Sequence, residues 1–245
     1  MIKRIRFGTR KTGVSAEAFS AAWPGAVAAA AHAPPDVRPA RVAVCVTLAG
    51  LTGPDPRHDG IGIEWFADAG HLDRLQGWLD TADGRLARHQ ADKIVDRDAS
   101  PVIVADESVL RGADWLEQRW RRGGEQLKHM AIALRATALT PAEFSERWKS
   151  RAGQIRRPGA AEVTVIPDAA RGHAYVQNHP RPRATGEWAY DALNEVYFDD
   201  VESLRTRIEW FRENLSDQAE EDLVRQFWFI AARETVPAPG NVSER

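Results

Sequence analysis

Residues 128–148 read KHMAIALRATALTPAEFSERW, and residues 3–23 read KRIRFGTRKTGVSAEAFSAAW. The two stretches align without a gap at a spacing of 125 residues, so a strand-like alternation and a helix start recur at the same places. Two later segments also recur, at spacings of 131 and 132: EWFAD at 64–68 with EVYFD at 195–199, and LDRLQGW at 72–78 with LRTRIEW at 204–210. A period of this length matches one small domain and is too long for a solenoid repeat. The sequence therefore predicts two copies of one folding unit.

The second copy shows the order of its elements directly. Residues 128–135 alternate between two kinds of side chain, which predicts a half-buried strand. Thr140, Pro141 and Glu143 form a capping box with proline at the first helical position, and the helix is expected to run to the stop at 156–159. Further strands are expected at 172–178, 192–198 and 224–232, and a helix at 201–214. The order β-α-β-β-α-β is that of a ferredoxin-like unit.

The first copy is expected to follow the same order. Trp23-Pro24-Gly25 lies inside its first helix and is expected to break or kink it. Its strands are expected at 2–9, 41–48, 61–66 and 102–106, and its helices from residue 15 and near 71–79.

The repeat also sets the expected domain boundaries. They are a first repeat at 1–110, a helical connector at 111–126, a second repeat at 127–236 and a disordered polar tail at 237–245. An antiparallel sheet with helices on one face leaves its other face uncovered, so the two sheets are expected to face each other. The predicted fold class is α+β: two tandem ferredoxin-like units that form an intramolecular α+β barrel.

Composition narrows the range of partners. The net charge is −2, with 33 basic and 35 acidic residues interspersed, so neither nucleic acid nor a membrane surface is expected as a partner. The single cysteine, Cys45, cannot form an intrachain disulfide, which suits a reducing compartment. No targeting or transmembrane segment is evident, and the expected location is cytoplasmic. A small-molecule substrate is the expected partner, and a homodimer through edge strands or helices is compatible with the sequence.

The strand faces opposite the helices should line the barrel. If the more apolar face of each strand packs on its helices, Arg4, Arg6 and Glu64 point inward in the first half. Buried charges need one another, water or a ligand, so two interpretations stay open: pairs that only fasten the sheets, or a site. In the second half the same rule gives an inward set of His129, Tyr175, Gln177, His179, Glu195 and Tyr197.

The two halves differ in their second strand. Residues 42–47 read VAVCVT, whereas residues 173–179 read HAYVQNH. Ala131 and Ala133 remove side-chain volume from the first strand of the second half. A solvent-reachable cavity is therefore expected in the second half, with the loop at 180–191, which carries Trp188, as its rim or lid.

Several familiar catalytic motifs do not occur. The sequence has no glycine-rich phosphate loop, HExxH, CxxC or Gly-x-Ser-x-Gly, and its seven histidines lack metal-ligand spacing. Neither a metal nor a cofactor is expected. Acid–base chemistry or plain binding by His, Glu, Tyr and Arg remains.

Several motifs resemble an EthD-type domain of the dimeric α+β barrel superfamily: LTPAEFSERW at 139–148, AYVQNH at 174–179 and NEVYFDDVESL at 194–204. Relatives in that superfamily include cofactor-free polyketide cyclases, dehydratases and decarboxylases, muconolactone-type isomerases, quinone-forming monooxygenases and heme-handling proteins. Many members carry a histidine about four residues after the helix tryptophan, where this chain has Val27 and Ala152. If that role has moved, His32 or His179 would take it. The resemblance also implies that Tyr175, Gln177, Asn178 and His179 line the pocket.

Three functions compete on this basis. The first is a cofactor-independent lyase or isomerase that acts on a small, apolar, oxygenated or aromatic, polyketide-like substrate, with His179 or His129 as base. The second is a non-catalytic binding or accessory protein, and the third is a heme-binding protein or cofactor-free monooxygenase. The expected catalytic residues are His179, His129, Glu195 and Tyr175, and the expected substrate-binding residues are Gln177, Tyr197, Arg4, Arg6, Glu64 and Trp188.

Overall fold

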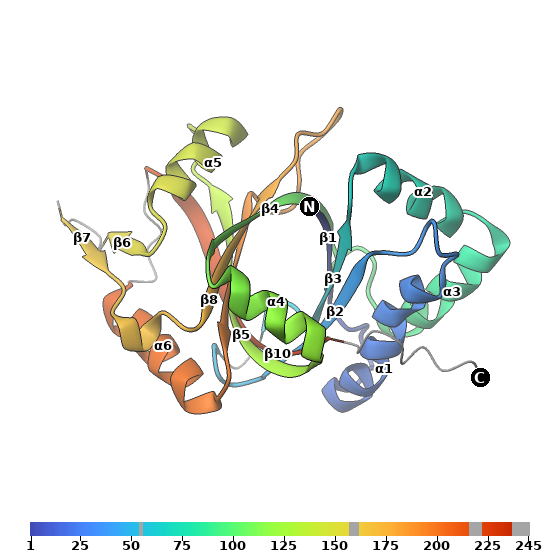
Figure 1. Cartoon of the computed structure of the whole chain (residues 1–245), viewed down its shortest axis with the longest axis horizontal. Coiled ribbons are helices and arrows are strands. Elements are labelled where there is room, and N and C mark those ends of the chain that lie inside the picture. Colours follow the sequence, from blue (N-terminus) through green and yellow to red (C-terminus); the bar gives the residue numbers. More distant parts are fainter. Residues whose placement is uncertain (54–55, 157–161, 216–221, 237–245) are drawn as a thin grey trace.

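The computed structural model describes residues 1–53, 56–156, 162–215 and 222–236, and in it eight strands close into one barrel (Figure 1). Each half of the chain contributes four of these strands. The first half gives β1 (Ile2–Gly8), β2 (Arg41–Thr47), β3 (Gly60–Phe66) and β4 (Val102–Arg111). The second gives β5 (Gly124–Arg135), β8 (Ala174–Pro180), β9 (Ala192–Phe198) and β10 (Val224–Val236).

The strand order shows how the two repeats combine. Within each half it is the ferredoxin-like order, β4-β1-β3-β2 and β10-β5-β9-β8. β2 pairs with β10 and β4 pairs with β8, so both outer strands of each sheet are joined to the other sheet. The predicted intramolecular α+β barrel is confirmed. Because the barrel strands of the described chain have partners on both sides, they offer no edge for a homodimer, and association through helices stays a prediction.

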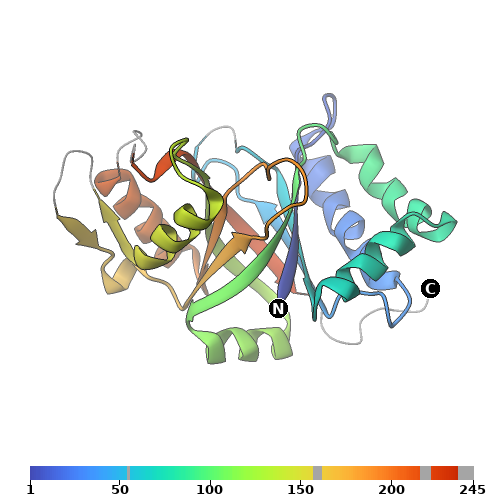
Figure 2. The same cartoon turned by 90° about the horizontal axis from the view of Figure 1, so that it is seen from above.

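The helices lie outside the barrel in two groups, and a further helix lies across one barrel end (Figures 1 and 2). On the first half are α1 (Ala16–Ala28), α2 (Ala69–Leu79) and α3 (Ala82–Ile94), and on the second half are α5 (Pro141–Ser150) and α6 (Val201–Asn214). The helix at the barrel end is α4 (Ala113–Arg122). The remaining elements are the paired strands β6 (Gln154–Arg156) and β7 (Val163–Val165) and the 3-10 turns at Ala29–His32 and Asp168–Ala170.

The helix caps repeat along with the helices. Ser15 caps α1 and Thr140 caps α5 at the same position of the repeat, and Asp68 and Asp200 do the same for α2 and α6. In each case a side-chain oxygen accepts a backbone N–H of the first turn, which would otherwise lack a partner. The predicted capping box of Thr140 and Glu143 is confirmed.

The first helix of each repeat differs in length from the expectation. α1 continues through Pro24 to Ala28, because Trp23 and Val27 are buried against the sheet and this packing offsets the missing hydrogen bond. α5, which was expected to reach residue 156, ends at Ser150, and Gly153 then adopts a left-handed conformation that ends the helical path. The helix expected to be damaged is therefore the longer of the two.

Two further elements differ from the expectation. β4 was expected at 102–106 but extends to Arg111, so the helix of the connector expected at 111–126 begins only after Gly112 and ends at Arg122. α3 follows α2 in the first half and was not predicted, because its sequence has no counterpart in the recurring segments.

The strands that carry the predicted inward residues face the opposite way from the expectation, except β9. The barrel interior is the apolar side of β1, β3 and β5, with Ile5, Ile63 and Met130 fully buried in one cluster. Polar side chains of these strands and of β8 also point outward to the helix layer, although Lys3, Lys128 and Asn178 lie inside the barrel. An interior closed to water favours large apolar residues, whereas the helix side of the second half tolerates polar ones around a cavity. The misplaced residues are Arg4, Arg6, Glu64, His129, Tyr175, Gln177 and His179.

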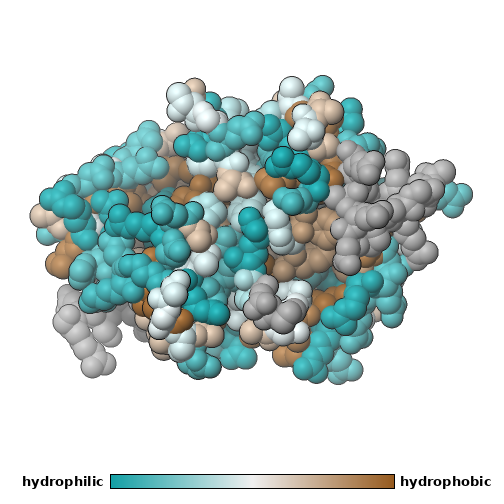
Figure 3. Space-filling view, turned by 180° about the vertical axis from the view of Figure 1, so that it is seen from behind, coloured by the Kyte–Doolittle hydropathy of each residue, from teal (hydrophilic) through white to brown (hydrophobic). Residues whose placement is uncertain are grey.

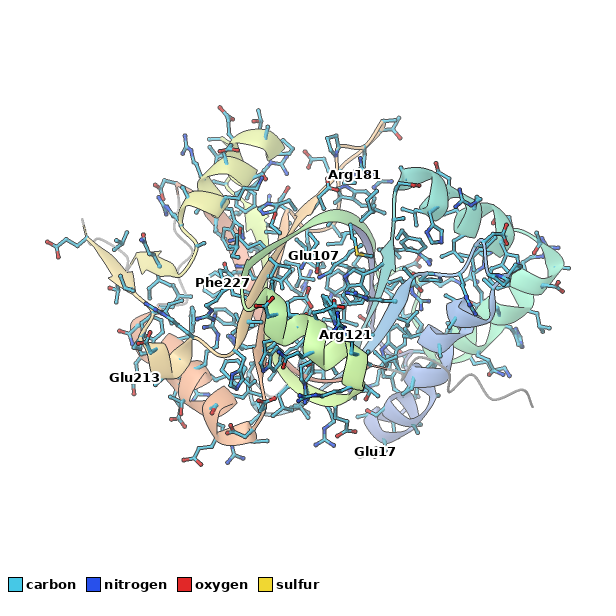
Figure 4. All side chains as sticks on the ribbon, viewed as in Figure 1. Glu17, Glu107, Arg121, Arg181, Glu213 and Phe227 are labelled. Carbon is cyan, nitrogen blue, oxygen red and sulfur yellow. The ribbon has the colours of Figure 1, made fainter. Side chains whose placement is uncertain are left out.

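Glu195 faces inward as expected, in a buried ionic cluster inside the barrel. Lys3 Nζ lies 2.6 Å from Glu195 Oε1 and 2.8 Å from Glu107 Oε1, and Lys128 contacts both Glu195 and Glu234. The two lysines belong to different repeats, so Glu195 connects the two halves. Figure 4 labels Glu107 at the barrel. Of the two interpretations that the sequence leaves open, this arrangement fits ion pairs that hold the two sheets together.

The cluster also corrects the alignment of the repeats. The residue opposite the repeated lysine is Trp65 on β3 and Tyr197 on β9. The spacing on these strands is therefore 132, the same as for the helices that follow them. Glu195 does not occupy the place of Glu64, which lies on the outer face of its sheet.

The outer surface carries most of the polar residues. The face opposite that of Figure 1 is mainly hydrophilic, with patches of apolar residues between (Figure 3). The helices of the described residues are each too short or too polar to span a lipid bilayer. The tail at 237–245 and the side chain of His32 lie outside the described residues.

Candidate functional site

A cavity of about 470 Å³ lies in the second half, between the outer face of the sheet and the layer formed by α5, α6 and β6–β7. Figure 4 labels Phe227 on the side of the barrel that faces these elements. The volume is in the range of small-molecule sites. The apolar wall consists mainly of Trp148, Ile155, Phe211, Leu223, Phe227 and Phe229.

The equivalent space in the first half is filled. The ring of Trp23 lies so close to Gly60 that a Cβ atom there would come within 2.5 Å of Trp23 Nε1, and Val27 lies against Gly62. In the second half, Ala152 takes the place of Val27 after the early end of α5. A smaller side chain and a shorter helix thus leave the second half hollow.

The floor of the cavity is polar where the first half is apolar. The first half has Val42 and Val44 on β2, and the matching residues on β8 are Tyr175 and Gln177. Gln177 Nε2 donates to the Tyr175 hydroxyl at 2.8 Å. The Tyr175 hydroxyl therefore accepts from the protein and keeps its own hydrogen for another partner. Burial raises the pKa of Tyr175, so the hydroxyl stays protonated at neutral pH.

His129 lies at the inner end of the cavity with Arg207. Arg207 Nε donates to His129 Nδ1 at 3.0 Å, and the imidazole stacks on Phe229 with ring centroids 4.8 Å apart. A guanidinium can only donate, so Nδ1 must be the acceptor and the neutral ring carries its proton on Nε2. Burial and the charge of Arg207 hold the pKa of His129 well below its usual range. His129 is therefore a neutral hydrogen-bond donor at neutral pH, and the expectation of a base tuned close to neutral pH is wrong.

The cavity contains four arginines, and none of its described lining residues is an aspartate or a glutamate. Arg171 is paired with Asp168 at 2.7 Å and Arg151 with Asp222 at 3.4 Å. Within the described parts of the chain, no carboxylate lies at ion-pair distance from the other two, Arg111 and Arg207. The site therefore carries an excess of positive charge. Burial lowers the pKa of Arg111, but Asp168, the partner of Arg171, also acts on Arg111 and raises its pKa.

Other predicted site residues of the second half lie elsewhere. His179 Nδ1 is 3.0 Å from Ser145 Oγ beneath α5, outside the cavity, and burial lowers its pKa to about 4. Asn178 and Tyr197 face the barrel interior and donate to Glu195 at 2.9 and 3.0 Å. Of the predicted second-half set, the structure brings together His129, Tyr175 and Gln177.

The predicted lid covers a different place. Trp188 and Tyr190 pack against the apolar barrel interior, and Tyr190 hydrogen-bonds His58 of the first half. The loop at 180–191 therefore closes one barrel end rather than the cavity. The loop follows His179 directly in sequence, but β8 directs it toward the first repeat, where Tyr190 meets His58.

The predicted first-half residues form a compact ion-pair group. Arg4 Nη1 and Arg6 Nη2 lie 2.8 and 3.2 Å from the buried Glu64 carboxylate. Arg6 Nη2 also donates to the carbonyl of Val27 at 3.2 Å, so the group ties α1 to the sheet. These contacts place the three residues in an ion-pair group outside the second-half cavity, and their predicted substrate-binding role stays a prediction.

Arg111 and Arg207 were missed from the sequence. Arg207 could have been noticed, because it lies three residues after Leu204 on the otherwise apolar face of α6. Arg111 gave no such indication, since its segment was expected to be helical. In the described parts of the chain, no group of three or more His, Cys, Asp or Glu side chains converges as metal ligands do.

No protein-family model matches the chain, and the comparison with curated proteins finds no significant match. A comparison of structures finds a putative monooxygenase from Lactobacillus acidophilus NCFM, with a TM-score of 0.47 and 12% sequence identity, over 97% of this chain and 95% of that chain. At this score and identity the similarity carries no information on activity. The EthD-type assignment stays a resemblance of short motifs, and the α+β barrel is what the structure establishes.

Proposed function

We propose that the protein binds a small, largely aromatic, oxygenated molecule in the second-half cavity. The observation that carries this proposal is the difference between the repeats: Trp23 and Val27 fill the space in one, and a cavity with Tyr175 and Gln177 on its floor occupies it in the other. Apolar walls with a few convergent polar groups are the usual composition of small-molecule sites.

Binding is better supported than general-base catalysis. Glu195 is held by two lysines inside the barrel, and His179 lies outside the cavity. His129 Nδ1, the basic nitrogen of the neutral ring, is already occupied by Arg207. A lyase or isomerase of the predicted kind would have to find its base among these residues.

A second candidate function is stabilisation of an enolate or phenolate formed on the bound molecule. It is favoured by two neutral donors in one cavity, the Tyr175 hydroxyl and the Nε2–H of His129, for which the described residues provide no acceptor. Such donors stabilise negative charge that develops on oxygen, and a site shielded from water strengthens them. The C–H proton would pass to solvent water, so such an isomerase or lyase activity would require a substrate acidic enough to ionise without a protein base. Heme binding and cofactor-free monooxygenation stay untested predictions.

The binding proposal is tested by filling the cavity. Ala131 lies on its floor, so Ala131→Phe should abolish binding of small molecules identified by native mass spectrometry and calorimetry of the purified protein. Ala142→Phe makes the same change at an exposed position of α5 and should leave binding intact. Equal binding by both variants, each shown to be folded by thermal denaturation, would place the ligand elsewhere.

The second candidate needs a reaction readout. Solvent deuterium should enter an acidic C–H position of the bound molecule, as followed by NMR. Tyr175→Phe should slow this exchange while changing affinity much less, because the hydrogen bond is strongest to the charged form. An exchange rate that is the same with and without protein would limit the function to binding.

A further inference from the structure

We propose that the ligand of the cavity is an organic anion, an aromatic carboxylate, whose charged group binds between Arg207 and Arg111. This inference rests on the proposed small-molecule function and adds the chemical class of the ligand.

Arg207 is the first observation. Its side chain comes from the helix layer into the cavity and is 7% exposed. Nε donates to His129 and Nη1 donates to the carbonyl of Ala170 at 2.7 Å. Both acceptors are uncharged, so in the described structure the positive charge has no anion beside it. Burying a charge without a counterion is unfavourable, and a ligand carboxylate would supply the missing partner.

Arg111 is the second observation. It reaches the cavity from β4, donates through Nη2 to the carbonyl of Arg171, and its buried Nε has no hydrogen-bond partner within the described chain. Burial lowers the pKa of Arg207 to about 9, with Arg111 contributing, and Arg171 lowers the pKa of Arg111 further after burial. Both guanidiniums line the same cavity, so an anion held between them would be attracted by two positive charges.

The neutral groups around this pair suit a carboxylate. Burial has the larger effect on the pKa of the Tyr175 hydroxyl and raises it, whereas both arginines act on the hydroxyl and lower its pKa. The hydroxyl also has a hydrogen to donate. His129 offers Nε2–H while Arg207 holds its other nitrogen. A carboxylate has two oxygens with about four acceptor positions, which matches two guanidiniums and two neutral donors.

The rest of the cavity suits an aromatic body. Phe227, Phe229 and Trp148 line it together with Ile155 and Leu223. Apolar surface removed from water would supply affinity, and the arginine pair would supply orientation and discrimination.

The test compares 2-naphthoate with 2-naphthamide, which have nearly the same shape and differ in charge. Calorimetry on the full-length protein at neutral pH should give naphthoate an affinity about ten- to a hundredfold higher, since hydrogen bonds to charged groups are worth about 1.5–3 kcal/mol. Equal affinities would overturn the anion inference and leave the cavity function standing. If neither probe binds and the native protein retains only neutral molecules by mass spectrometry, the anion inference is wrong; if no small molecule binds at all, the proposed function fails with it.

Variants identify the groups that discriminate. Arg207→Met and Arg111→Met should each remove most of the preference for naphthoate while naphthamide binding changes little. Arg207→Lys keeps a positive charge and should retain part of the preference for naphthoate. This variant serves as the control if Arg207→Met does not fold. Arg212→Met removes an exposed arginine of α6 outside the cavity and should change neither affinity. A preference that survives in both methionine variants would overturn the assignment.

Discussion

Arg207 Nε and His129 Nδ1 are 3.0 Å apart, and the direction of that hydrogen bond sets the chemistry of the cavity. Because the Arg207 guanidinium can only donate, Nδ1 of His129 must accept. The proton of the neutral ring is therefore on Nε2, and His129 offers a ligand an N–H group rather than a lone pair. The same contact carries the arginine into the sheet face, where it lacks a carboxylate in the described structure. One interaction between α6 and β5 thus makes the site a donor of hydrogen bonds to negative charge.

The tautomer of His129 can be observed directly. Nitrogen-15 NMR of the imidazole should show a protonated Nε2 and an unprotonated Nδ1 at neutral pH, and the ring should resist protonation well below its ordinary range. In Arg207→Met the pKa of His129 should rise, because one of its two lowering causes is gone, but burial should keep it below the usual value. Protonation of wild-type His129 near pH 6.5 would contradict this account.

Glu195 is expected to act in stability rather than in ligand binding. Glu195→Gln leaves Lys3 and Lys128 without their shared carboxylate in the barrel interior, and the free energy of unfolding should fall by about 3–5 kcal/mol. Glu187→Gln removes an exposed partner of Arg135 and should cost at most about 1 kcal/mol. Urea denaturation measures both. Ligand affinity of the folded Glu195→Gln protein should be unchanged, and a specific loss of affinity would restore a role in the site.

The tight packing of Trp23 against the first-half sheet can be tested by adding a methyl group at Gly60. Gly60→Ala would bring its Cβ within 2.5 Å of Trp23 Nε1, which donates to the carbonyl of Cys45, so we expect a loss of about 1–3 kcal/mol. Gly77→Ala lies on an exposed turn of α2, where the described chain leaves the Cβ open space, and should stabilise by roughly 0.5–1 kcal/mol. Equal melting temperatures for the two variants would argue against tight packing of Trp23.

Acid should destabilise the protein through His58. This buried ring bridges Thr9 and Tyr190, and burial, with a smaller effect of Arg57, lowers its pKa from 6.5 to about 4. Because the unfolded chain binds the proton more tightly, stability is retained above pH 6.5 and is lost progressively as the pH falls toward 4, by up to about 3 kcal/mol from this group.

The pH dependence is measured by denaturation between pH 7 and 4. His58→Gln should show a shallower loss than the wild type, although it starts from a lower stability. His89→Gln changes an exposed histidine of α3 and should follow the wild-type slope. His179, whose pKa is also lowered to about 4, accounts for part of the slope that remains.

The β-α-β-β-α-β order of each repeat could be predicted from the sequence because it depends on local patterns. Alternation marks strands, and a capping group such as Thr140 with Glu143 marks a helix start, whatever the chain packs against. The repeat then gave two units, and two four-stranded sheets with one bare face each left the barrel as the expected combination. The N-cap pairs Ser15 with Thr140 and Asp68 with Asp200 show how consistently this local information is repeated.

The location of the candidate site depends on which face of each strand is enclosed, and the alternation of side chains does not determine this. A period of two separates the faces of a strand but does not say which face is enclosed, so His129 and Tyr175 were grouped correctly with each other and wrongly with Glu195. Because β2 pairs with β10 and β4 pairs with β8, the interior is enclosed, and apolar side chains such as Ile5 and Met130 fill it around the buried ionic cluster of Glu195.

By itself the sequence determined the two repeats, their element order and the residues from which a site could be made. Only the tertiary structure decided that α5 ends early, that Arg207 reaches His129 across the layer, and that the cavity lies beneath helices rather than inside the barrel. The physical reason is that a cavity is the space left over by packing, which depends on the volumes of side chains brought together from distant parts of the chain.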